Sequence, residues 1–215
     1  MEVYYKIFNK IFSFDDKINN IYGVPTVLDV YTGVTTTPKG YIKVKLTQNL
    51  INEARSRFQA VQESVMGGNF TNKFVTENRW IEHVGQISVE RWLLTLGVDF
   101  KVDYALGRAD DFDIKIDNIK IDVKTSTFDH RKGIQPYVFV NADQIENKTF
   151  DVYIFVKYSE AEMCCYIVGW AFGCKVVGHK TVTSIVNTKL AAPCKALLIS
   201  GLKPMGVLLN EVYNN

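Results

Sequence analysis

The sequence predicts an α/β (α+β) fold in which helices flank a central mixed β-sheet. Two observations carry this prediction: an apolar-striped helix precedes a series of strand-like segments, and two of those segments alternate strictly between apolar and charged residues. An apolar fraction of 47% in 215 residues is enough for a substantial core. We expect one compact domain at this length, with an N-terminal extension over residues 1–75 packed on a core over residues 76–215.

The charge balance restricts how the chain could meet a nucleic acid. Its net charge of +2 provides no global basic field, so any nucleic-acid surface must be a local groove. The N-terminus lacks a secretory pattern, and no apolar run is long enough for a membrane span, so we expect a cytoplasmic protein without a membrane partner. The four cysteines form no CxxC pair and are expected to be buried thiols: Cys164, Cys165, Cys174 and Cys194.

The N-terminal extension should contain two short strands and one helix. Strands are expected at residues 26–31 and 41–47, the second because apolar and polar residues alternate along it. The helix expected at 48–65 ends at the Met-Gly-Gly-Asn stop of residues 66–69. Its apolar stripe consists of Leu50, Ala54, Phe58 and Val61.

The core region should begin with a helix over residues 77–96 that stops at Gly97. Gly85 inside this helix costs about 1 kcal/mol relative to alanine, which indicates close packing nearby. The pattern of the region from 171 to the C-terminus predicts little structure, apart from a final helix that could begin at Pro204. Strands are expected at 112–116, 119–124, 137–140, 152–156 and 165–168, with a short polar segment at 141–148.

The segment 111–124 is predicted to be a β-hairpin with a two-residue turn at 117–118. Pairing the strands from that turn places Asp113 opposite Asp122 and Asp111 opposite Lys124. One face of the hairpin is then entirely charged. The other face is entirely apolar and comprises Phe112, Ile114, Ile116, Ile119, Ile121 and Val123.

Two carboxylates directly opposite each other repel, unless a cation lies between them. Oxygen ligands at that separation suit Mg²⁺, Ca²⁺ or Mn²⁺. Asp111 is an alternative ligand to Asp113, which we prefer because it faces Asp122. From the hairpin alone, a solvated ribbon with mixed charges is an equally good interpretation, since Lys115 and Lys120 also face each other.

A third carboxylate lies on the preceding helix. Glu90 is surrounded in sequence by apolar residues, so its side chain should be partly buried and should require a cation. His83 and Gln86 share its helix face and could line the same site. The alternative is that Glu90 forms an ion pair with a nearby arginine, such as Arg79 or Arg91.

Together these residues resemble the PD-(D/E)XK nuclease superfamily, which has the restriction-endonuclease-like fold, and in particular its small phage-type members. The family pattern is a helix with a Glu followed by a hairpin with an Asp and a (D/E)-x-K, here Glu90, Asp113 and Asp122-Val123-Lys124. The resemblance covers residues 78–171, and the segments FDVYIFVKY and YIVGWA look like outer strands of such proteins. Asp110 precedes Asp111 where the family name suggests proline.

The resemblance implies a Mg²⁺-dependent deoxyribonuclease, with Mn²⁺ as a substitute metal. Glu90, Asp113, Asp122 and the carbonyl of Val123 would hold the metal, and Lys124 would orient the attacking water. DNA is the expected partner, RNA an alternative substrate, and a homodimer a further expectation. Gln135 could line the site, and nucleic-acid contacts could come from Lys115, Lys120, Arg131 and Lys132.

The rival interpretation is a nuclease-like fold without catalysis. Such a protein would act as a nucleic-acid-binding or host-modulating interaction protein in a bacterial or phage-infected cell. A missing ligand type in the motif would favour this rival, and the motif here contains every essential type.

Overall fold

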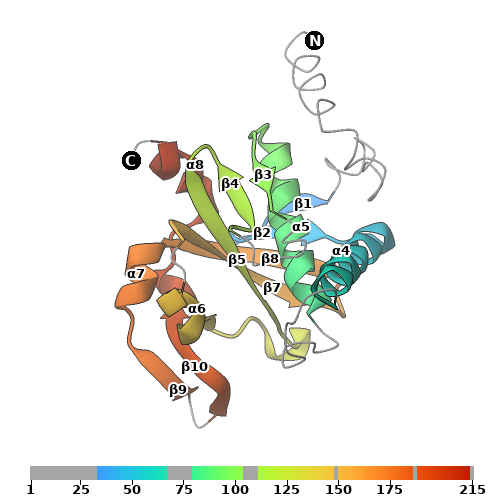
Figure 1. Ribbon diagram of the computed structural model, residues 1–215. Helices are drawn as coiled ribbons and strands as arrows, with labels where there is room; N and C mark the ends of the chain where they lie inside the picture. The colour runs from blue at the N-terminus through green and yellow to red at the C-terminus, as the bar shows by residue number, and fades with distance from the viewer. Residues whose placement is uncertain (1–32, 67–78, 104–110, 148–149, 186–187, 214–215) are drawn as a thin grey trace.

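Seven strands form a curled mixed sheet that organises the molecule (Figure 1). The computed structural model describes residues 33–66, 79–103, 111–147, 150–185 and 188–213. The strand order is β1-β2-β8-β7-β5-β4-β3, and β5 and β7 are parallel whereas their other neighbours are antiparallel. The strands are β1 (Val34–Thr36), β2 (Ile42–Lys45), β3 (Lys101–Val102), β4 (Ile114–Ile116), β5 (Ile119–Thr127), β7 (Val152–Ser159) and β8 (Cys164–Phe172).

Two long helices cover one face of this sheet. α4 (Gln48–Met66) and α5 (Trp80–Thr95) pack against each other, and α5 lies on β5 (Figure 1). The predicted stripe of α4 is buried at Leu50 and Ala54 and half-buried at Phe58 and Val61. These helices and the apolar side chains of β2, β4, β5, β7 and β8 form the main core. The mixed α/β character predicted from the sequence is therefore confirmed.

A second sheet of three antiparallel strands covers part of the opposite face. Its order is β6-β10-β9, with β6 at Tyr137–Asn141, β10 at Thr188–Leu198 and β9 at Thr181–Ile185. Its core joins β6 and β10 side chains to Tyr153 and Phe155 of β7. The remaining short elements are η1 (His130–Lys132), α6 (Ala142–Asn147), α7 (Gly173–Gly178), η2 (Ile199–Gly201), η3 (Met205–Val207) and α8 (Leu208–Tyr213).

Helix α5 lies against β5 at the glycine that the sequence singled out. An added Cβ at Gly85 would lie 1.8 Å from Thr125 Oγ1, so only glycine allows this approach. Gly97 follows the helix with φ +68°, a left-handed conformation that favours glycine. Both sequence predictions, the close packing at Gly85 and the helix stop at Gly97, are confirmed.

Several predictions for the periphery need correction. The segment 137–140 forms β6 of the second sheet rather than a strand of the central one, and its partners β9 and β10 were not predicted. The segments expected as outer strands are β7 and β8, which lie inside the seven-stranded order because β1 and β2 extend the sheet beyond them. Part of the polar segment 141–148 is helix α6, and Cys174 is exposed rather than buried.

The N-terminal extension and the final helix agree with prediction in part. The strand expected at 26–31 lies outside the described residues. Pro204 precedes η3 and α8, so the predicted final helix begins as a 3₁₀ turn. The described part of the extension contributes β1 and β2 to the main sheet, where β2 pairs with β8.

Within the ranges that the structure describes, no helix combines the length and apolarity needed to cross a bilayer.

Lys157 of β7 is a buried cation between the two sheets, and it predicts a pH-dependent stability. Its ammonium donates to the carbonyl of Tyr137 at 2.8 Å, its side chain is buried, and burial lowers its pKa to about 8. Between pH 8 and the ordinary value of 10.5, the unfolded chain holds a proton that the folded chain has released. The free energy of unfolding should therefore rise with pH, and this stabilisation should be lost as pH falls through 8.

We expect the free energy of unfolding, measured by urea titration, to rise by about 1 kcal/mol between pH 7 and pH 9 through this group alone. The matched variant Lys157→Met should lack that rise. Comparing the two chains removes the opposing effect of Cys164, whose pKa is raised to about 11 by burial. Equal pH slopes for the two chains would contradict the assignment.

Candidate active site

The predicted hairpin is present, with its turn as expected and its register as expected from Ile114 to Ile121. Asp117 has φ 51°, the left-handed conformation that a two-residue turn requires. Ile114 pairs with Ile121, and Lys115 pairs with Lys120. Local alternation and turn chemistry were therefore sufficient to fix the pairing of β4 with β5.

The register departs from prediction beyond Ile114. The backbone N–H of Asp113 donates to the carbonyl of Ile121 at 3.0 Å, so Asp113 is not paired directly opposite Asp122. Its carboxylate Oδ2 instead accepts the backbone N–H of Val123 at 2.6 Å. A short carboxylate can replace a backbone partner in this way, which ends the regular ladder. The carboxylate of Asp113 still lies beside the strand that carries Asp122 and Lys124.

The two hairpin faces are confirmed only in part. Ile114 and Ile121 are fully buried in the main core, as predicted for the apolar face. Phe112 instead packs with the core of the second sheet, because the alternation breaks at Asp113. The opposite face is not a solvated ribbon at Asp122, which is only 5% exposed and lies beside Tyr153 of β7 in the strand register.

Asp122 and Lys124 form an ion pair on this covered face. The ammonium of Lys124 lies 2.7 Å from Asp122 Oδ2 and donates to Oδ1 at 2.9 Å. Burial would lower the pKa of Lys124, but the carboxylates of Asp122, Asp113 and Glu82 outweigh it and raise that pKa above its ordinary value. Lys124 is therefore a cation at neutral pH, with 22% of its side chain exposed.

Helix α5 contributes Gln86 and Glu82 to the surroundings of this pair. The amide of Gln86 donates to the carbonyl of Asp113 at 3.1 Å, in agreement with its predicted place at the site. Glu82 lies one helical turn earlier, and its carboxylate acts electrostatically on Lys124. Sequence reasoning missed Glu82, although its spacing of four residues from Gln86 places both on one helix face.

Glu90, the predicted helix ligand, has a different partner. Its two oxygens accept hydrogen bonds from Arg57 of α4 at 2.6 and 2.9 Å, and Arg57 also binds Glu53. Arg57 and Glu90 are both buried. An arginine does pair with Glu90, but it comes from α4 rather than from the nearby positions 79 or 91. The arginine pair is thus the alternative interpretation of Glu90, and its role as a metal ligand stays a prediction.

Two other predicted lining residues lie away from the ion pair. The ring of His83 lies 6.4 Å from that of Phe58, so it faces α4. Gln135 lines a pocket beyond the end of β5 together with Lys132. Asp111, the alternative ligand, is exposed, and its backbone N–H donates to Asp103.

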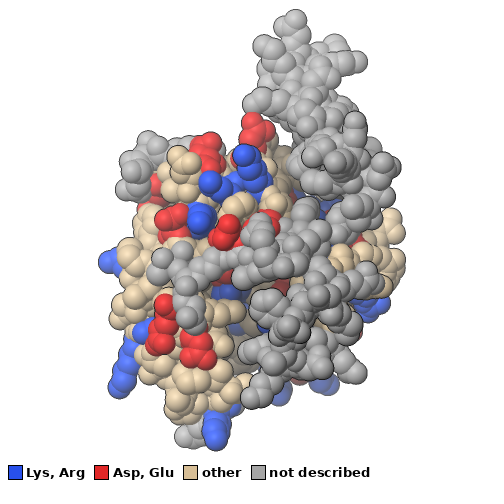
Figure 2. Space-filling view, in the orientation of Figure 1, with Lys and Arg blue, Asp and Glu red and all other residues tan. Residues whose placement is uncertain are grey.

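The predicted nucleic-acid contacts fall into two groups. Lys115 and Lys120 are half-buried cross-strand neighbours on the hairpin. Arg131 is exposed at η1, where it forms an ion pair with Asp129. Figure 2 shows acidic and basic side chains interspersed around the position of β3 and β4 in the face it draws. The local charge is therefore mixed there.

Two carboxylates beside Lys124, those of Asp113 and Asp122, are the side chains here that could hold a divalent cation. Among the residues that the structure describes, no group of three or more His, Cys, Asp or Glu side chains is gathered as a metal cage. Asp113 and Asp122 offer two carboxylates on either side of Val123, whose N–H binds Asp113 and which follows Asp122 in β5. Mg²⁺ commonly binds through one or two carboxylates and takes its other ligands from water and substrate phosphate.

Comparisons of this chain with protein family models, with curated proteins and with solved structures find no match.

Proposed function

We propose that this chain is a Mg²⁺-dependent nuclease that hydrolyses phosphodiester bonds of DNA at Asp113, Asp122 and Lys124. The observation that carries the proposal is the convergence of these three side chains around Val123. The ammonium of Lys124 is 2.7 Å from Asp122, and the carboxylate of Asp113 is bound to the Val123 amide. The order of a helix and then this hairpin also fits the restriction-endonuclease-like core that the sequence resemblance implies.

Asp113 and Asp122 would hold the metal, with the carbonyl of Val123 as a further oxygen ligand. When bound, Mg²⁺ supplies Lewis-acid stabilisation of phosphate oxygens and acidifies water. We assign Glu82 rather than Glu90 as the helix carboxylate of this chemistry, because its charge helps to raise the pKa of Lys124 and its partner Arg79 is 3.9 Å away, whereas Glu90 is bound to Arg57. Gln86 positions Asp113 through its backbone carbonyl.

Lys124 acts in this proposal as a donor rather than as a base. Its raised pKa keeps a proton on Nζ at neutral pH, so the ammonium can donate hydrogen bonds to a phosphate oxygen or to the attacking water. In the free protein the same ammonium neutralises Asp122. Binding of a divalent cation by Asp122 would free Lys124 to turn toward the anionic phosphate.

The rival function is a nuclease-like fold that binds nucleic acid or another protein without catalysis. One observation favours it: Glu90, the Glu of the family pattern, is bound to Arg57. In the nuclease proposal, the exposed carboxylate of Glu82 on the same helix takes the role that the family pattern gives to its Glu.

Incubation of the purified chain with linear and circular DNA separates the two functions. We expect cleavage products with Mg²⁺ or Mn²⁺ and none with EDTA, because both carboxylates require the cation to approach phosphate. Gel electrophoresis of both substrates also distinguishes endonuclease from exonuclease action. The absence of cleavage for every DNA and RNA tested, together with no metal binding, would contradict the proposal and favour the rival.

A further inference from the structure

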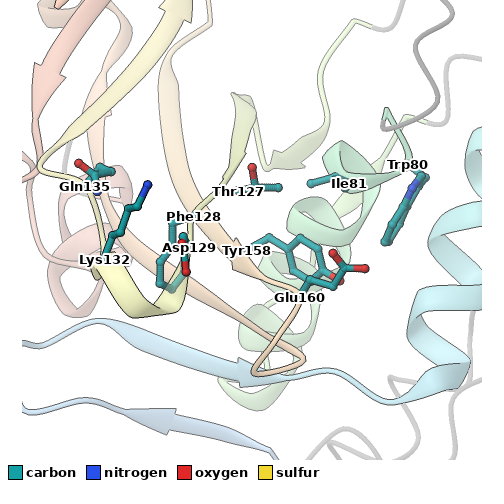
Figure 3. A pocket seen from close by; sticks show the side chains of 9 residues that line it. All are labelled: Trp80, Ile81, Thr127, Phe128, Asp129, Lys132, Gln135, Tyr158 and Glu160. Carbon is teal, nitrogen blue, oxygen red and sulfur yellow. The ribbon is translucent and has the colours of Figure 1, made fainter. Parts of the chain in front are cut away.

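A pocket of about 580 Å³ lies where the parallel strands β5 and β7 end (Figure 3). Trp80 and Ile81 from the start of α5 line it, as do Phe128 just after β5 and Tyr158 near the end of β7. Ligands of α/β proteins commonly bind at the carboxyl ends of parallel strands. The volume is also in the range of small-molecule sites. The candidate active site uses none of these side chains.

The aromatic side chains of the pocket are held in place by the fold. Tyr158 is almost fully buried, and its ring meets that of Trp80 edge-on at a centroid distance of 6.0 Å. The backbone N–H of Phe128 donates to the carbonyl of Tyr158 at 3.1 Å. Phe128 remains partly exposed, and so does Trp80, although the Arg55 guanidinium lies over its ring at 4.9 Å from the centroid. The pocket therefore offers preformed aromatic surface, on which nucleobases stack regardless of sequence.

Polar groups line the pocket on both sides of Tyr158, with Lys132, Gln135 and Asp129 toward Phe128 and the carboxylate of Glu160 toward Trp80. Figure 3 shows Lys132 and Gln135 on one side of Phe128, with Trp80 on the other side of Tyr158. The Lys132 ammonium suits a phosphate, and the Gln135 amide can both donate to and accept from a base edge. The carboxylate of Asp129 in the same wall is bound to Arg131 at 3.2 Å, which offsets its repulsion of phosphate.

The pocket adjoins the candidate active site through two elements. Thr127 of β5 lines the pocket three residues after Lys124, which corresponds to about 10 Å along a strand. The first turn of α5 presents Trp80 and Ile81 to the pocket and Glu82 to Lys124. One nucleic-acid strand could therefore reach both places with neighbouring nucleotides.

We infer that this pocket binds unpaired nucleobases of the strand that is cut at Lys124, one stacked on Phe128 with Lys132 on its phosphate and another stacked on Trp80. The inference rests on the proposed nuclease function and specifies its substrate class as DNA with single-stranded nucleotides next to the scissile bond. A base within a duplex is stacked between its neighbours and would have to leave the helix to enter a concave site. Blunt duplex DNA is therefore the poorer substrate.

Intrinsic fluorescence provides a binding test that does not depend on catalysis. Of the three tryptophans, Trp92 and Trp170 are buried, so Trp80 is the one that a ligand can reach. Titration of the full chain with an oligothymidylate in EDTA should quench this emission saturably, and Trp80→Phe should abolish the change. Phe128→Ala should weaken binding roughly tenfold, since the variant lacks the ring on which the base stacks. Phe139→Ala, a half-buried aromatic on β6, is the matched control and should bind like wild type.

Each outcome of the titration decides the inference. Absent quenching, equal affinity in Phe128→Ala, or equally strong competition by a blunt duplex would overturn it. Pocket-dependent binding without cleavage of any substrate would overturn the nuclease function and leave the base-binding site standing. Cleavage of blunt duplex and single-stranded DNA at equal rates, unchanged in Phe128→Ala, would overturn the base-binding site and leave the nuclease function standing.

Discussion

Replacement of Lys124 by methionine is expected to lower the rate of Mg²⁺-dependent DNA cleavage by roughly 10²- to 10³-fold, the usual effect of removing one donor to developing charge. Methionine keeps most of the side-chain volume and removes only the ammonium. The loss should appear in kcat rather than in KM, because the proposed hydrogen bond strengthens in the transition state. Single-turnover cleavage at saturating Mg²⁺ measures it directly.

The variant must be shown to be folded, because Asp122 is buried and loses its ion-pair partner. Circular dichroism and thermal unfolding provide this check. Lys45→Met is a matched control, since Lys45 is an exposed strand lysine on β2, three strands away from β5. Full activity in a folded Lys124→Met chain would contradict the role of Lys124, and an equal loss in Lys45→Met would show that the effect is not local.

Replacement of Glu90 by leucine is expected to lower the free energy of unfolding by about 3 kcal/mol, because it leaves the buried Arg57 guanidinium without its bidentate partner. Glu53 remains as a single partner and limits the loss. Urea denaturation at neutral pH measures the change. The double variant Arg57→Met/Glu90→Leu should recover most of the stability, since apolar residues of similar size often replace a buried ion pair without loss.

The double variant also separates a structural role of Glu90 from metal binding. If Glu90 fastens α5 to α4, the refolded double variant should cleave DNA at close to the wild-type rate. Burial raises the pKa of Glu53, so this carboxyl can take up a proton once Arg57 is absent. A stable double variant that has lost Mg²⁺-dependent activity would instead indicate that Glu90 binds the metal.

Glu82→Gln is expected to lower activity without a comparable loss of stability, because its side chain is 61% exposed.

The sequence predicted those features that depend on local chemistry. Alternation and the turn at Asp117 were enough for the pairing of β4 with β5 and for the buried side chains of Ile114 and Ile121. The cost of a glycine in a helix correctly indicated the contact of Gly85 with Thr125. Such features are readable because their causes lie within a few residues of each other.

The features that were missed depend on long-range partners or on one side chain competing with the backbone. The Arg57 partner of Glu90 lies 33 residues away on another helix, so no local spacing could reveal it. The carboxylate of Asp113 takes a backbone hydrogen bond from Val123, which ends the regular ladder at Ile114, and alternation does not encode such a competition. The β6–β10 pair packs on Tyr153 and Phe155 and covers a face that the local pattern made look solvated.

The most direct measurement is the anomalous difference map of a crystal of this protein soaked in Mn²⁺. The proposed function predicts a Mn²⁺ peak bound by the carboxylates of Asp113 and Asp122, with the Lys124 ammonium displaced from its ion pair. A map with Lys124 still bound to Asp122 and no Mn²⁺ at these carboxylates, from crystals whose solution sample binds the metal, would contradict it.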